Sequence, residues 1–248
     1  MKEGRKRMIT YKMITNQGGR EVNEDSATAA EIDGNYCFVL ADGLGGHGKG
    51  EVASALVVET VKQIFQQYQE ADFLEKSFET AQQNLLDEQK RQDAQSKMKT
   101  TMVVLTFVNG QVRWGHIGDS RLYYFHKRKL VKHTLDHSVP QMLVMAGEIK
   151  EKQIRGHEDR NRLLRVMGVE WGEARYTLAD PIPIGSGQAY LLCSDGFWEL
   201  IEEKTMQQLL KKSHSVEEWV DMMTAEVKKN GVGKNMDNYT AIGVWVEE

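Results

Sequence analysis

The sequence predicts an α+β fold in which two mainly antiparallel sheets form a sandwich flanked by helices. Several short segments are rich in β-branched and aromatic residues and are bounded by Gly, Asn or Asp, which is typical of strands. They are 8–15, 36–41, 101–108, 112–117, 122–125, 188–193 and 239–246. Asn109-Gly110 lies between two of them, and this pair accepts the positive φ angles of a tight hairpin turn. Hairpin-like neighbours favour antiparallel pairing with helices packed outside the sheets.

Other segments have the one-sided apolar periodicity of amphipathic helices. Residues 48–68 and 72–95 each carry an apolar stripe, and the second is otherwise strongly charged. Near the C-terminus, Ser215 and Glu218 have the spacing of a capping box, and a further stripe follows them. A short helical patch is expected near Pro140. We expect each stripe to pack against a sheet.

Composition excludes several classes of protein. The chain has 248 residues and a formal net charge of −4, without the basic surplus of most nucleic-acid-binding proteins. The basic run at 2–7 is expected to be a solvated terminus. No apolar stretch is long enough to span a bilayer. No linker or low-complexity segment divides the chain, so we expect one domain over 1–248.

The two cysteines indicate a reducing compartment. Cys37 and Cys193 each lie in an apolar run, and neither belongs to a C-x-x-C pair. Buried free thiols are therefore expected, and a cytoplasmic location follows as the default.

Four aspartates border the strongest predicted strands. Asp42, Asp119 and Asp195 each follow an apolar strand, and Asp237 directly precedes the last one. A single Asp-Gly pair at a strand end is usually turn chemistry. Four such carboxylates would repel one another, and only Asp119 has a cation nearby in the sequence, at Arg121. A divalent cation would resolve this repulsion.

The ligand type selects the metal. Carboxylate, carbonyl and water ligands suit Mg²⁺ and Mn²⁺, whereas zinc would need Cys or His at short spacing. His133 and His137 are four residues apart, but we expect them to be solvated or core histidines.

Two polar loops could contribute to such a metal site. Arg20 precedes the adjacent carboxylates Glu24 and Asp25, and an arginine can hold a phosphate through two parallel hydrogen bonds. The glycine-rich loop 43–50 is not a P-loop, because Lys49 is followed by Gly50. We expect its glycines to let backbone approach a metal closely.

These motifs, taken in order, resemble the PPM family of type 2C metal-dependent serine/threonine phosphatases, and most of all its compact bacterial members. The motifs are Arg20-x-x-Asn23-Glu24-Asp25, Ala41-Asp42-Gly43, Lys99-Thr100-Thr101, Gly118-Asp119-Ser120-Arg121, Asp136-His137-Ser138, Ser194-Asp195-Gly196 and Asp237-Asn238. Each is weak alone, but the ordered set is specific and covers about Asn16 to Val246. The resemblance implies a four-layer α-β-β-α sandwich.

The resemblance also implies a role for each site residue. Two Mn²⁺ or Mg²⁺ ions are expected, with a third ion shared by Asp119 and Asp195. The implied ligands are Asp42 as the bridging carboxylate, Asp195 and Asp237 on one ion, the Gly43 carbonyl on the other, and Glu24 and Asp25 partly through water. Arg20 would hold the substrate phosphate, and a mobile flap is expected at about 138–165.

The chain departs from the family pattern at several positions. Leu44 stands where eukaryotic relatives carry a histidine proposed as a general acid, as is usual in bacterial members. Lys99 stands where Gly usually precedes the Thr pair. Residues 156–161 replace a usual His-Pro pattern, and 197–199 replace Leu-Thr-Asp. These departures bear on substrate preference rather than on the metal ligands.

The expected reaction is hydrolysis of phosphoserine and phosphothreonine by metal-activated water, with Arg20 and the ions fixing the phosphate. Implied partners are phosphoproteins that are substrates of a cognate serine/threonine kinase, without nucleic acid or a membrane span, and the chain is taken as a monomer. A non-catalytic pseudophosphatase that binds phosphoproteins is a rival, which the complete ligand set disfavours. A phosphatase of small molecules or of an anti-sigma-type phosphoprotein also stays open, because specificity resides in loops.

Overall fold

The computed structural model describes residues 8–44, 48–95, 97–172 and 175–247. The basic run at 2–7 and residues 45–47 of the glycine-rich loop lie outside the described residues. The strands are β1 (Ile9–Asn16), β2 (Asp25–Ile32), β3 (Asn35–Leu44), β4 (Lys99–Thr100), β5 (Met102–Val108), β6 (Gln111–Ile117), β7 (Arg121–His126), β8 (Lys129–His133), β9 (Thr177–Leu178), β10 (Ile182–Pro183), β11 (Gln188–Cys193) and β12 (Tyr239–Val246). The helices are α1 (Gly50–Gln67), α2 (Phe73–Gln92), α3 (Val139–Met145), the 3₁₀ helix η1 (Glu151–Gly156), α4 (Asp195–Trp198), α5 (Glu203–Lys212) and α6 (Val216–Gly231).

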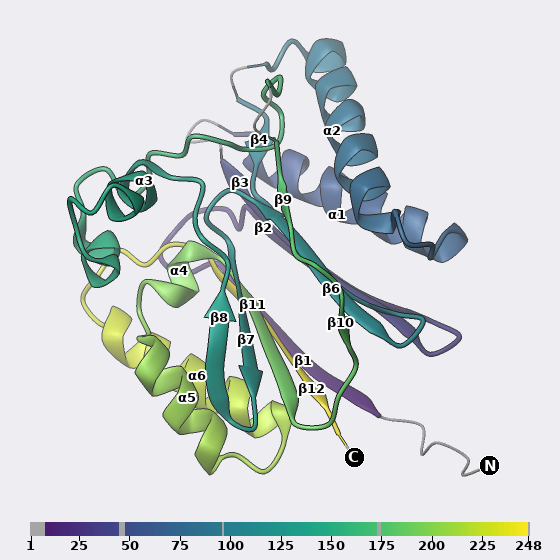
Figure 1. Cartoon of the computed structure of the whole chain (residues 1–248). Helices are drawn as coiled ribbons and strands as arrows, with labels where there is room; N and C mark the ends of the chain where they lie inside the picture. Colours follow the sequence, from purple (N-terminus) through teal and green to yellow (C-terminus); the bar gives the residue numbers. More distant parts are fainter. Residues whose placement is uncertain (1–7, 45–47, 96, 173–174, 248) are drawn as a thin grey trace.

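The strands form two sheets that face each other, as Figure 1 shows. One sheet has the order β1-β12-β11-β7-β8. The other has the order β10-β6-β5-β3-β2, with β4 paired to β3 and β9 to β6. Every strand pair in the described part of the chain is antiparallel. The predicted sandwich of antiparallel sheets is confirmed.

Three apolar layers hold this sandwich together. One lies between α1, α2 and the second sheet, one between the two sheets, and one between the first sheet and α5, α6. Strand β3 shows why its sequence is apolar throughout: Cys37 and Val39 face the helices, whereas Phe38 and Leu40 face the other sheet. Because both faces are buried, the strand cannot alternate with polar residues. The architecture has the four layers α-β-β-α.

Local signals in the sequence are largely confirmed. Asn109 and Gly110 have φ angles of 50° and 78° in the β5–β6 turn, as the Asn-Gly pair predicts. Ser215 Oγ accepts the Glu218 N–H at the start of α6, but the Glu218 carboxylate accepts the N–H of His214 rather than of Ser215. The predicted capping box is therefore half formed, and its second bond is displaced by one residue.

The segment between β8 and β9 carries the short helices α3 and η1. It folds back on itself through an antiparallel bridge between Ser138 and Leu163. Arg155 and Arg160 fasten it to the body of the protein, with N–O distances of 2.6 Å to Glu203 and 3.2 Å to Glu199. No described helix is both long and apolar enough to cross a membrane.

Candidate metal centre and active site

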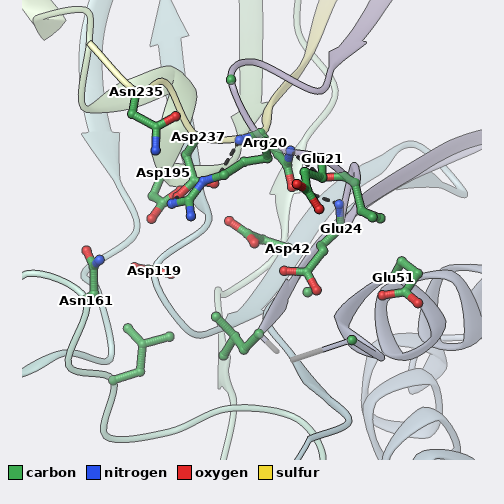
Figure 2. A pocket seen from close by; sticks show the side chains of 17 residues that line it. Arg20, Glu21, Glu24, Asp42, Glu51, Asp119, Asn161, Asp195, Asn235 and Asp237 are labelled. Carbon is green, nitrogen blue, oxygen red and sulfur yellow. Dashed lines mark hydrogen bonds and ion pairs between the residues drawn. The ribbon is translucent and has the colours of Figure 1, made fainter. Parts of the chain in front are cut away.

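A cavity of about 720 Å³ opens where β3, β6 and β11 end and β12 begins. Figure 2 shows the carboxylates of Asp42, Asp119, Asp195 and Asp237 around it, with Arg20 above and Glu24 toward α1. Of the predicted site residues, the cavity is lined by Arg20, Glu24, Asp42, Gly43, Asp119, Asp195 and Asp237. The sequence had placed them from residue 20 to residue 237, and the fold brings them together.

Asp42 is held by the backbone of its own strand. It does not end β3, as the sequence suggested, because the strand continues to Leu44. The Asp42 N–H donates to Thr101 Oγ1 at 3.0 Å, and the Thr101 N–H donates to the Asp42 carbonyl at 2.9 Å. Thr100 Oγ1 donates to the same carbonyl at 2.8 Å. The two threonines therefore fix the direction in which the Asp42 carboxylate enters the cavity.

Asp25 lies behind the cavity, directly opposite Asp42. The two are register partners in the β2–β3 pair, a position in which like charges destabilise a sheet. Asp25 is buried, and its Oδ2 accepts the Ser194 hydroxyl at 2.7 Å. Its Oδ1 is buried without any hydrogen-bond partner among the described residues. A buried carboxylate oxygen without a hydrogen-bond donor, beside a second carboxylate, fits a position next to a bound cation.

The approach of α1 to β3 requires two glycines. A Cβ on Gly43 would lie 2.3 Å from the Gly50 carbonyl oxygen, and one on Gly50 would lie 2.7 Å from Glu24 Oε1. The Gly43 N–H donates to the Glu24 carbonyl at 3.0 Å. Close packing of bare backbone thus leaves the end of β3 and the Glu24 carboxylate at the cavity. The approach of this backbone to a metal stays a prediction.

Asp119 is positioned by Trp198, which the sequence alone did not indicate. The indole Nε1 of Trp198 donates to the Asp119 carbonyl at 3.0 Å. The Arg121 guanidinium lies 3.6 Å from the centre of the Trp198 ring. Arg121 in turn pairs with Asp136 through two hydrogen bonds of 2.8 and 2.7 Å. Arg121 is therefore not the partner of Asp119, contrary to what their spacing suggested.

Asp237 does have a cation, which the sequence argument missed. Arg20 donates to its Oδ2 at 2.6 Å, and both side chains are partly exposed. This pair raises the pKa of Arg20 above its usual value, so the guanidinium stays charged. Arg20 therefore stands at the cavity rim with a permanent positive charge.

Burial and mutual repulsion destabilise the ionised form of the clustered carboxylates. Burial raises the pKa of Asp42 well above its usual value, and the charges of Asp25, Asp195 and Asp119 raise it further. Burial and the charge of Asp119 do the same to Asp195. Burial raises the pKa of Asp119 to about 7 and that of Asp25 to about 6. Since no lysine lines the cavity among the described residues, Arg20 alone cannot neutralise this cluster.

These residues fit hard divalent cations. The donors are carboxylate oxygens and backbone, and no histidine or cysteine lines the described cavity wall. Within the described residues, no three His, Cys, Asp or Glu side chains already stand in an arrangement that could hold a metal ion. The metal ligands therefore stay a prediction. Carboxylates standing apart around a cavity suit ions that keep several water ligands, as Mg²⁺ does.

Several cavity residues were not found from the sequence. Those that the sequence had not singled out are Glu21, Val22, Glu51, Leu163 and Asn235, with Gly19 beside Arg20, whereas Leu44, Gly48, Asn161 and Asn238 had been noted without a site role. Glu51, in the first turn of α1, offered a signal, because it follows the glycine-rich loop. Asn161 and Leu163 fall inside the flap expected at about 138–165, but no motif assigned them to the cavity. His137 is buried as expected, and both cysteines are buried and free.

The Trp198 hydrogen bond leads to a testable prediction. Trp198→Phe keeps a ring against Arg121 but leaves the Asp119 carbonyl without its donor. We expect the Mn²⁺ concentration for half-maximal activity to rise about fivefold, the effect of one hydrogen bond of about 1 kcal/mol. Trp219→Phe is the matched control, because its indole also donates to a buried carbonyl, that of Met206 at 3.1 Å, far from the cavity. Equal Mn²⁺ requirements in the two variants would contradict the positioning role.

The sequence and the fold were both compared with known proteins. Residues 16–238 match the family model described as Protein phosphatase 2C. The serine/threonine phosphatase stp of Listeria welshimeri is 31% identical over 232 residues, 90% of each chain. The crystal structure of Stp1 from Staphylococcus aureus aligns with a TM-score of 0.86 and 27% identity, over 97% of this chain and 96% of that one. The catalytic domain of the phosphatase PstP, in complex with 2 manganese ions, aligns with a TM-score of 0.83 and 26% identity, over 97% and 99%.

Fold and site together define a metal-dependent phosphatase on a four-layer sandwich. The chain belongs to the protein phosphatase 2C family, the metal-dependent serine/threonine phosphatases that the motif order had indicated.

Proposed function

We propose that this chain removes phosphate from phosphoserine and phosphothreonine in proteins, using two Mn²⁺ or Mg²⁺ ions held by the carboxylates of its cavity. The observation that carries the proposal is the buried pair of Asp25 and Asp42, which are register partners and of which Asp25 keeps one carboxylate oxygen without a hydrogen-bond partner among the described residues. Membership of the family and the manganese-bound PstP domain support it.

The proposed ligands are those that the family resemblance implies, and all of them except Asp25 line the cavity. Asp42, Asp195, Asp237 and the Gly43 carbonyl would hold two ions, with Asp42 shared between them. Glu24 and Asp25 would act partly through water, and Asp119 with Asp195 would hold a third ion. Bound ions would supply a water that ionises near neutral pH and can act as the nucleophile.

The protein's own side chains bind and orient the substrate. Arg20 lies at the cavity rim and would exchange its bond with Asp237 for the phosphate oxygens, which accept both guanidinium donors. Thr100 and Thr101 hold the backbone of Asp42, and Trp198 holds the backbone carbonyl of Asp119, which would limit movement of the two residues during the reaction. Leu44 lines the cavity at the position where eukaryotic relatives carry the histidine proposed as a general acid, so the proton for the leaving oxygen would come from water or another group.

The remaining expectations are part of the same proposal. We infer one domain over 1–248, with a flap at about 138–165 that contributes Asn161 and Leu163 to the cavity wall. The chain would act as a cytoplasmic monomer against the targets of a serine/threonine kinase. The buried free thiols of Cys37 and Cys193 agree with a reducing compartment.

Metal dependence is the direct test. We expect the purified protein to hydrolyse p-nitrophenyl phosphate and a phosphothreonine peptide with Mn²⁺ or Mg²⁺. In excess EDTA it should lose roughly 95% of this activity or more, because the chelator removes nearly all of the metal. Restored Mn²⁺ should restore the rate. A folded, metal-loaded protein that hydrolyses neither substrate would instead favour the non-catalytic phosphoprotein binder.

A further inference from the structure

A second cavity, of about 650 Å³, adjoins the first. Leu44, Asn161 and Leu163 line both cavities, so the two lie side by side. We call this second cavity the side groove. It also carries the charged side chains of Lys99, Arg165 and Glu170. A peptide whose phosphorylated residue sits at Asp42 would place its neighbouring residues here.

Three adjacent backbone segments build the side groove. Lys99 on β4 is the register partner of Leu44 on β3, which lies two residues beyond Asp42. The next residue, Thr100, forms an antiparallel bridge with Met167, with N–O distances of 2.8 and 3.3 Å. This bridge brings the chain that carries Arg165 alongside β4. Both cations are thus placed by backbone pairing close to the catalytic strand.

Neither cation is neutralised by the protein. Within the described residues, Lys99 and Arg165 form no ion pair, and Arg165 donates only to the Arg175 carbonyl, at 3.0 Å. Burial lowers the pKa of Arg165, as expected for a half-buried cation without an anionic neighbour. Glu170 is exposed and pairs with neither cation. An exposed lysine is ordinarily just solvated, but two uncompensated cations in a groove joined to a phosphate site are complementary to an acidic ligand.

The side of the metal cavity that lies away from the side groove is negatively charged. Glu21, Glu24 and Glu51 line it toward α1, on the far side from Asn161 in Figure 2. Acidic side chains of a substrate would be repelled there and attracted to the side groove. The two walls therefore favour one placement of a charged peptide across the site.

We propose that the side groove selects phosphoprotein segments with acidic residues next to the phosphorylated serine or threonine, through Lys99 and Arg165. Apolar walls from Leu163 and Trp171 would contact the stems of these residues. This inference rests on the proposed function, because it concerns the substrates of the same site.

The test uses phosphothreonine peptides of equal length that carry Glu, Gln or Lys at the positions flanking the phosphothreonine on either side. Release of inorganic phosphate gives kcat/KM for each. We expect kcat/KM for the Glu peptides to exceed that for the Lys peptides about 10-fold. Each of the two half-exposed ion pairs should contribute a factor of about three, and the two factors multiply. In Lys99→Glu the Glu-to-Lys ratio should fall about 10-fold, and Arg165→Gln should lower it about threefold.

The ratio within one variant is the readout, since loss of metal or fold would lower both rates together and leave the ratio unchanged. Lys97→Glu is the matched control, because Lys97 is exposed two residues away and lies outside the side groove. It should keep the wild-type ratio. Equal rates on Glu and Lys peptides, or equal shifts in Lys97→Glu and Lys99→Glu, would overturn the inference. If p-nitrophenyl phosphate and all peptides stay intact with Mn²⁺, the proposed function itself fails instead.

Discussion

Asp42→Asn should lower kcat by about 10³-fold or more while the protein stays folded, because a preorganised charge at the reacting centre is lost. Asp42 stands at the centre of the carboxylate cluster, and its backbone is fixed by Thr100 and Thr101. The amide has nearly the same shape, so the packing of β3 is kept. The neutral oxygen cannot hold two cations together, and metal binding should weaken in parallel. Phosphate release at saturating Mn²⁺ measures the first effect and calorimetric titration the second.

The melting temperature of the variant distinguishes this loss of activity from simple unfolding. In EDTA, Asp42→Asn should melt at a temperature equal to or above that of the wild type, because it removes one of two opposed buried charges. Asp221→Asn is the control: this exposed aspartate on α6 pairs only with Lys12, at 3.8 Å, and should change neither property. A folded Asp42→Asn protein with near-normal activity would show that Asp42 is not a metal ligand.

Strands with both faces buried were predictable, whereas the edge strands β2 and β8 were missed. β5, β11 and β12 have almost wholly buried residues, so their sequences are uninterrupted apolar runs. β2 lies at a sheet edge with mostly half-buried residues and reads Asp-Ser-Ala-Thr-Ala-Ala-Glu-Ile, which has little β propensity. β8 is likewise an edge strand, rich in lysine. Tertiary pairing, not local preference, makes both of them strands.

The site residues likewise divide into those that the sequence could reveal and those that depend on tertiary structure. Asp42, Asp119, Asp195 and Asp237 could be found because each borders an apolar strand, and strand ends meet at a common edge. That Asp25 opposes Asp42 depends on the register of a strand the sequence did not reveal. Arg121 pairs with Asp136 rather than with Asp119, and Asp237 pairs with Arg20. The partners in these ion pairs are distant from each other in the chain. Linear spacing could not distinguish a neighbour in sequence from a partner in space.

The stabilisation that Mn²⁺ gives the protein should increase between pH 5 and pH 7.5. The folded pKa of Asp25 is about 6 and that of Asp119 about 7, above the usual 3.8. For a raised carboxyl pKa, the contribution to stability is complete below the unfolded value and is lost as pH rises through the folded value. In EDTA the part of this loss that falls above pH 5 is about 1.4 kcal/mol for Asp25, taking 1.36 kcal/mol for the roughly one pKa unit between pH 5 and its folded pKa of about 6. Bound Mn²⁺ requires the ionised form and reverses the penalty.

Comparison at each pH with and without metal isolates these carboxylates from other buried groups. Burial lowers the pKa of His116 to about 4 and also lowers that of His137, which destabilises the protein as pH falls, but equally in both samples. From Asp25 alone, the difference in Tm between Mn²⁺ and EDTA should grow by roughly 3–6 °C over this range, at 2–4 °C for each kcal/mol in a chain of this size. Asp42→Asn should show little of this growth, since its cluster no longer holds the ions. A difference in Tm that is independent of pH would mean that Mn²⁺ does not bind at the carboxylates whose burial raises their pKa.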